Sequence, residues 1–140
     1  MSPRESLRVR LFLDANVLVS AAWKGNSKVA RIWQIAGVDL VTSSYVVAEC
    51  RRNLPREEQQ IRLTKYLASV RVLDIPGIPV LENPPRLAEK DQPVLAATVL
   101  ARADFLVTGD RNHFGQWYGS TICGLRLEPP ASFPAVLFEH

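Results

Sequence analysis

Four acidic residues stand where predicted strands end or predicted helices run, so that the fold could bring them together. They are Asp14, Glu49, Asp91 and Asp110. Carboxylates that crowd together repel one another, and burying them is unfavourable unless a cation is present. Four oxygen-donor acids with no His or Cys as a partner ligand suit a hard divalent ion such as Mg²⁺ or Mn²⁺. Such an ion binds phosphates, so the pattern predicts a metal site that could hydrolyse a phosphodiester bond.

Each acid also has an ordinary structural interpretation when it is taken alone. Asp91 precedes Gln-Pro and could be a helix N-cap, Glu49 could be a solvated residue on a helix flank, and Asp110 after Gly109 could belong to a turn. Asp14 is the hardest to explain in this way, because it lies between two apolar runs at a predicted strand end. Asn16 could support Asp14 or a substrate phosphate, but we expect it to cap the helix that follows.

The elements that must position these acids alternate between strands and helices. Short bounded apolar runs predict strands at Val9–Leu13, Leu40–Thr42, Val70–Leu73, Phe105–Thr108 and Thr121–Cys123. Helical spacing predicts helices at Val17–Trp23, Lys28–Ala36, Val46–Leu54, Glu57–Ser69 and Gln92–Ala103, with a last turn at Phe133–Phe138 and a loop at Pro76–Pro85. This order predicts an α/β fold with a mostly parallel sheet. Because parallel strands end at one edge, Asp14 and Asp110 should share a crevice there.

The overall composition fits one globular domain, which we expect to span residues 1–140. The chain has 47% hydrophobic and 22% charged residues and a formal net charge of +3, which is compatible with a polyanionic partner without requiring one. The N-terminus lacks the apolar core of a signal peptide, and no apolar run reaches the length of a membrane span. Cys50 and Cys123 have no metal-ligand spacing. We expect both to be buried, reduced thiols in a cytoplasmic protein.

Three segments together resemble the signature blocks of the PIN domain family. They are FLDANVLVSAAW, VVAECRRNL and EKDQPVLAATVLARADFLVTGDRNHFG, in the family's order and spacing. The resemblance implies a three-layer α/β/α sandwich and a metal-dependent endoribonuclease that uses Mg²⁺ or Mn²⁺. The family's acidic quartet would correspond to Asp14, Glu49, Asp91 and Asp110. Small members of the family are often toxins of toxin–antitoxin pairs, so the resemblance also implies an RNA substrate, a small antitoxin protein and a homodimer.

One departure from the family pattern leaves another function open. Several members carry a further Asp two positions after the fourth acid, where this chain has Asn112. A non-catalytic RNA-binding or scaffold PIN domain is therefore the main alternative. A phosphatase of the haloacid-dehalogenase type is a weaker one, because Asn16 occupies the place of that family's second Asp and no lysine lies between Lys90 and Asp110.

Basic residues near the acids are candidates for guiding an RNA backbone. They are Arg51, Arg52, Lys90, Arg102 and Arg111. Their positive charge would offset the acidic cleft, which otherwise repels a polyanion. Each could equally be a solvated surface residue.

Overall fold

A six-stranded sheet forms the middle layer of the protein. The computed structural model describes residues 8–74, 92–110, 114–122 and 124–133. The strands are β1 (Val9–Leu13), β2 (Val38–Ser43), β3 (Arg71–Leu73), β4 (Phe105–Val107), β5 (Thr121–Ile122) and β6 (Leu125–Glu128). Their order across the sheet is β3-β2-β1-β4-β6-β5, and every neighbouring pair is parallel except β5 with β6. The predicted α/β fold with a mostly parallel sheet is confirmed.

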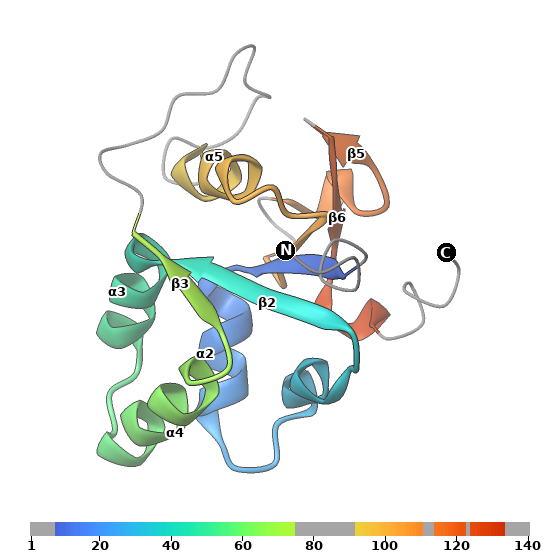
Figure 1. Ribbon diagram of the computed structural model, residues 1–140. Coiled ribbons are helices and arrows are strands. Elements are labelled where there is room, and N and C mark those ends of the chain that lie inside the picture. The colour runs from blue at the N-terminus through green and yellow to red at the C-terminus, as the bar shows by residue number, and fades with distance from the viewer. Residues whose placement is uncertain (1–7, 75–91, 111–113, 123, 134–140) are drawn as a thin grey trace.

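Helices cover both faces of this sheet. The α-helices are α2 (Ala15–Trp23), α3 (Ser44–Asn53), α4 (Glu57–Leu67) and α5 (Gln92–Leu100), and the 3₁₀ helices are η1 (Lys28–Gln34), η3 (Gly115–Trp117) and η4 (Pro130–Ser132). Figure 1 shows α5 on one face, with α2, α3 and α4 on the other. The expected three-layer α/β/α sandwich is therefore confirmed. No helix in the described part of the chain is long and apolar enough to cross a membrane.

The core explains why the central strands read as continuous apolar runs. Leu11, Phe12 and Leu13 of β1 are fully buried, as are Leu106 and Val107 of β4. A strand covered by helices on both faces must be apolar on both faces, which removes the alternation seen in half-exposed strands. These two strands form the middle of the sheet, so the residues directly after them are held in place by the packed core.

The structure corrects several predicted boundaries. The first helix begins at Ala15 instead of Val17, because Asp14 is its N-cap. Residues 28–34 form a 3₁₀ helix instead of an α-helix. The strand Leu125–Glu128 was not predicted, and it follows Gly124, whose φ of +83° allows the tight turn from β5. The helix expected to reach Ala103 ends at Leu100, and Arg102 follows in a left-handed conformation.

Helix α4 turns one of its apolar residues toward solvent. Ile61 is 51% exposed. Leu63 is instead the fully buried residue of this helix. Tyr66 packs its ring against Trp33 with 4.7 Å between ring centroids, and its carbonyl accepts a hydrogen bond from the Trp33 indole.

The predicted loop at Pro76–Pro85 and most of the predicted turn at Phe133–Phe138 lie outside the described residues.

Candidate active site

The candidate site lies where the chain reverses its direction of travel across the sheet. From β1 the chain adds β2 and then β3 on one side, and it later crosses to place β4 on the other side of β1. In open α/β sheets, ligands bind at such a switch point, beyond the carboxyl ends of the strands. Asp14 directly follows β1, and Thr108, Gly109 and Asp110 directly follow β4. The topology thus brings together residues that are almost a hundred positions apart in the sequence.

Asp14 is a buried carboxylate that several donors hold in one orientation. Its side chain is only 5% exposed. Oδ1 accepts a hydrogen bond from the Ala15 amide at 2.7 Å, and Oδ2 accepts one from the Thr108 hydroxyl at 2.8 Å and one from the Asn16 amide at 3.3 Å. Buried charge is tolerated when it is hydrogen-bonded in this way. The Asp14 backbone amide also donates to the Val107 carbonyl at 3.0 Å, which ties the site to β4.

Asn16 links the start of α2 to the residues that follow β4, and it is not the N-cap of α2. Its Nδ2 donates to Asp14 Oδ2 and, at 3.2 Å, to the Thr108 hydroxyl, while its Oδ1 accepts from the Gly109 amide at 2.7 Å. The expectation that Asn16 is the N-cap was wrong, because Asp14 has that position. Gly109 allows the close approach, since a Cβ there would lie 3.3 Å from Asn16 Oδ1. Asn16 therefore supports Asp14, which was the alternative to capping that the sequence left open.

Helix α3 brings a third carboxylate to the site. Its N-cap is Ser43, whose hydroxyl accepts a hydrogen bond from the Val46 amide at 3.2 Å. Tyr45, Glu49 and Asn53 are spaced four residues apart, so they lie along one face of the helix. Val46 and Cys50, each one position further along the helix, form an adjacent stripe that is fully buried. Glu49 is partly exposed, as its predicted place beside the apolar stripe requires.

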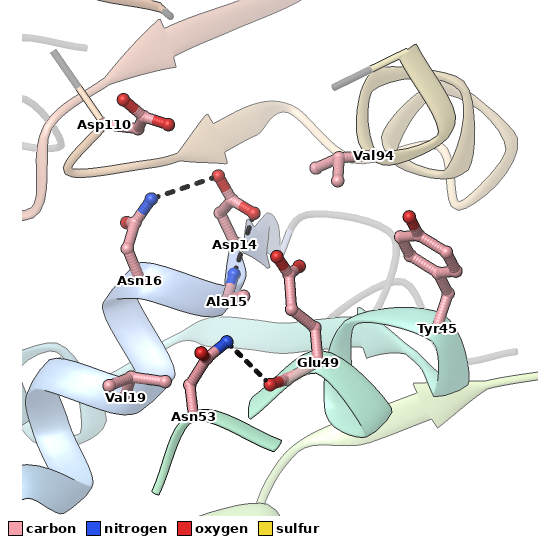
Figure 2. A pocket seen from close by; sticks show the side chains of 9 residues that line it. All are labelled: Asp14, Ala15, Asn16, Val19, Tyr45, Glu49, Asn53, Val94 and Asp110. Carbon is pink, nitrogen blue, oxygen red and sulfur yellow. Dashed lines mark hydrogen bonds between the residues drawn. The ribbon is translucent and has the colours of Figure 1, made fainter. Parts of the chain in front are cut away.

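These residues surround one pocket of about 380 Å³. Its lining consists of Asp14, Ala15, Asn16, Val19, Tyr45, Glu49, Asn53, Val94 and Asp110. Figure 2 shows the Glu49 side chain extending from α3 toward the Asp14 carboxylate, with Asp110 on the loop beyond Asp14. Three of the four predicted acids therefore line the same pocket. Asp91 lies outside the described residues, but Val94, three positions later in the sequence, is part of the lining.

The donor set fits a hard divalent ion in its chemistry. Among the residues that the structure describes, the polar lining offers carboxylate and amide oxygens and the Tyr45 hydroxyl, with no thiolate or imidazole. Oxygen donors are the ligands that Mg²⁺ and Mn²⁺ prefer. Among the described residues, no three His, Cys, Asp or Glu side chains are close enough to form a ready-made cage. Mg²⁺ does not need such a cage, because it keeps several waters and commonly binds one or two carboxylates together with substrate phosphates. Asp14, Glu49 and Asp110 would hold such an ion directly or through water.

Cys50 lies beneath the site as an inert thiol. It is fully buried, and its Sγ donates to the Ala15 carbonyl at 3.6 Å. Burial, and after it the negative charges of Glu49 and Asp14, raise the pKa of this thiol to about 12. The expectation of a buried, reduced Cys50 is confirmed, while Cys123 lies outside the described residues.

A chemical-labelling experiment should show this inertness. In a Cys123→Ser variant at pH 8, we expect Cys50 to resist a thiol-specific reagent while the protein is folded and to react rapidly in denaturant. The physical reason is that the thiolate is the reacting species, and both burial and the raised pKa suppress it. Labelling of the folded protein at the rate of the denatured chain would contradict the prediction.

Sequence reasoning missed three residues of the site. Thr108 was read only as the end of a strand, yet its hydroxyl donates to Asp14, and it accepts from Asn16 and from the Asp110 amide at 3.2 Å. Tyr45 and Asn53 were also missed, although their four-residue spacing from Glu49 was a usable signal. Thr108 had the weaker signal, a hydroxyl residue between an apolar strand and a Gly-Asp pair.

The structure gives Arg51 a different task from the one considered for it. Its guanidinium donates to the Gln60 carbonyl and side chain at 3.2 and 3.0 Å, and to the Thr64 hydroxyl at 3.0 Å. These bonds join α3 to α4, so Arg51 holds the helix that carries Glu49. Arg52 and Arg102 are exposed, and Lys90 and Arg111 lie outside the described residues, as do Asn112 and His113.

Comparisons with known proteins agree with this fold. Among solved structures, the chain is similar to one in VapBC2 from Rickettsia felis bound to a DNA fragment from its promoter, with a TM-score of 0.62, 18% identity and coverage of 86% of this chain and 98% of that one. It is also similar to a PilT N-terminus domain protein from the archaeon Sulfolobus solfataricus P2, with a TM-score of 0.50, 12% identity and coverage of 94% and 96%. No curated protein gives a significant match. A family model described as PIN domain matches residues 10–112, so the chain belongs to the PIN domain family.

Proposed function

We propose that this protein is a metal-dependent endoribonuclease whose catalytic centre is the pocket at the switch point of the sheet. The observation that carries the proposal is the convergence of Asp14, Glu49 and Asp110 from three separate elements on one pocket. PIN domains are generally nucleases, and a metal-dependent nuclease would use an acidic pocket of this kind. Asp91, the residue directly before α5 in the sequence, would complete the quartet.

The individual side chains would divide the work of phosphodiester hydrolysis. A bound Mg²⁺ or Mn²⁺ would polarise the scissile phosphate and neutralise the charge that develops on it. Asp14 is suited to holding the ion, because its orientation is already fixed by three donors. Glu49 reaches into the pocket from a helix and is suited to orient the attacking water and take its proton. Asn16 and Thr108 would keep Asp14 aligned throughout.

A protein partner is a second part of the proposal. The Rickettsia felis structure is a VapBC2 complex, and nearly the whole of its similar chain is covered by the likeness. We propose by analogy that this chain is the toxin of a toxin–antitoxin pair, held inactive by a small antitoxin, and that it forms a homodimer. Its substrate would be cytoplasmic RNA. Co-expression with the product of the adjacent gene, followed by size-exclusion chromatography, tests both associations.

Removing the metal provides the most general test of the proposed activity. Protein purified free of any partner should cut total cellular RNA at discrete positions with Mn²⁺ or Mg²⁺, and EDTA should abolish the cuts. Re-addition of Mn²⁺ should restore them, because the acidic pocket repels phosphate without a cation. Sequencing the ends identifies the target RNA.

Two outcomes would overturn the nuclease proposal. Cleavage that persists in excess EDTA would show that the acidic pocket does not act through a metal. RNA binding without cleavage under any metal would instead favour a non-catalytic RNA-binding or scaffold PIN domain. Asn112, which stands where several family members have an acid, would then be consistent with the missing activity.

A further inference from the structure

Tyr45 is an exposed aromatic residue on the wall of the catalytic pocket. The residue is 48% exposed, so about half of its surface is open to solvent at the pocket. It stands in the first turn of α3, one helical turn before Glu49, so the two side chains rise from the same face about 6 Å apart at their bases. Figure 2 shows the ring extending from α3 toward α5, on the other side of Glu49 from Asn16.

The pocket combines a group of carboxylates with an apolar wall at one side. Asp14 and Asp110 lie at the sheet edge, whereas Tyr45 and Val94 lie toward α3 and α5. A nucleotide likewise has two parts, a charged phosphate and a flat, largely apolar base. Aromatic side chains bind bases by stacking, and they do so without strong sequence preference because every base has a π-face.

We propose that Tyr45 stacks on a base of the RNA next to the scissile phosphate and thereby selects single-stranded substrate. This inference rests on the proposed function, since it assumes that the phosphate binds at the carboxylates. In a duplex both faces of each base are covered by its neighbours, so a ring cannot reach them. In a single strand one base can turn outward onto Tyr45 while its phosphate lies beside Glu49.

The test measures binding, so it does not depend on cleavage. All proteins carry Glu49→Gln, which removes the proposed base but keeps Asp14 and Asp110, so that the RNA stays intact. Each is titrated in saturating Mn²⁺ against a short single-stranded RNA with 2-aminopurine at successive positions. We expect quenching at one position and, for Tyr45→Ala, a dissociation constant raised about tenfold or more. Tyr45→Phe should bind like the parent, because stacking needs the ring and not the hydroxyl.

Two controls separate stacking from a structural effect. Trp23→Ala removes a ring that is equally exposed, at 50%, but at the far end of α2, roughly 13 Å along the helix from Asp14, and it should leave affinity unchanged. An RNA that lacks the base at the quenched position should bind the parent and Tyr45→Ala equally. Thermal unfolding of each variant checks that the fold is kept.

The outcomes also distinguish this inference from the proposed function. Equal affinity of the parent and Tyr45→Ala, undetectable binding by every variant, or a tenfold loss that persists with the abasic RNA would overturn the stacking role, even if the wild-type protein cuts RNA. A base-dependent loss in a protein that never cuts RNA would keep Tyr45 as a binding residue and reject the nuclease.

Discussion

Replacing Asp14 with Asn is expected to reduce RNA cleavage by at least about 100-fold while the protein stays folded. The buried carboxylate is the best-oriented acid in the pocket, and the amide keeps its shape but not its charge. Cleavage of a labelled RNA under single-turnover conditions in Mn²⁺ measures the effect. A variant that cuts at the wild-type rate would remove Asp14 from the catalytic site.

The same substitution should have a small effect on stability. Asn remains a good N-cap, so the bond from the Ala15 amide can be kept. The new NH₂ group, however, would face the Asn16 amide, which now donates to Oδ2. We therefore expect a loss of about 1 kcal/mol in the free energy of unfolding, partly offset by less repulsion among the acids. Asp39→Asn is the matched control, because Asp39 lies near the start of β2 and pairs with Arg8 at the surface.

Replacing Thr108 with Val should have the second-largest effect, although Thr108 does not line the pocket. Val has nearly the same shape but removes a buried hydroxyl that serves Asp14, Asn16 and the Asp110 amide. Loss of a hydrogen bond to a charged group predicts destabilisation of about 1.5–3 kcal/mol. Residues that orient a metal ligand typically contribute 10- to 100-fold to metal affinity or activity, so cleavage should fall by a similar factor.

Denaturant unfolding and Mn²⁺-dependence of cleavage measure the two effects of Thr108→Val separately. Thr108→Ser retains the hydroxyl and should recover most of the cleavage while losing only the methyl contact. If Val and Ser variants are equally impaired, the methyl group and not the hydroxyl is important, and the positioning role is wrong.

The central sheet could be predicted because its strands carry a strong local signal. Runs such as Leu11–Leu13 and Phe105–Val107 are apolar on both faces, which is typical of a parallel strand between helices. The short strand β6 was missed because its alternation of Arg126 and Glu128 with two leucines resembles a surface segment. In the structure Glu128 is buried, with Arg126 Nε 3.5 Å from its carboxylate, a pairing that no local pattern reveals.

The site was predictable in its acids but not in its supporting bonds. Strand ends locate Asp14 and Asp110 on one edge, and helical periodicity places Glu49 on the flank of α3. The role of Asn16 was misjudged because capping is a local preference, whereas two of its three observed partners, Thr108 and Gly109, are more than ninety residues away. Long-range hydrogen bonds of this kind depend on strand order, which the sequence does not state.

Calorimetric titration with Mn²⁺ tests most directly whether these acids form one metal site. We predict that the wild-type protein binds Mn²⁺, that Asp14→Asn and Asp110→Asn each abolish binding, and that Glu49→Gln weakens it, because the three carboxylates line the same pocket. Asp39→Asn should bind like the wild type. If the three pocket variants bind Mn²⁺ as tightly as the wild type, the acids do not share an ion, and the proposed metal-dependent mechanism is contradicted.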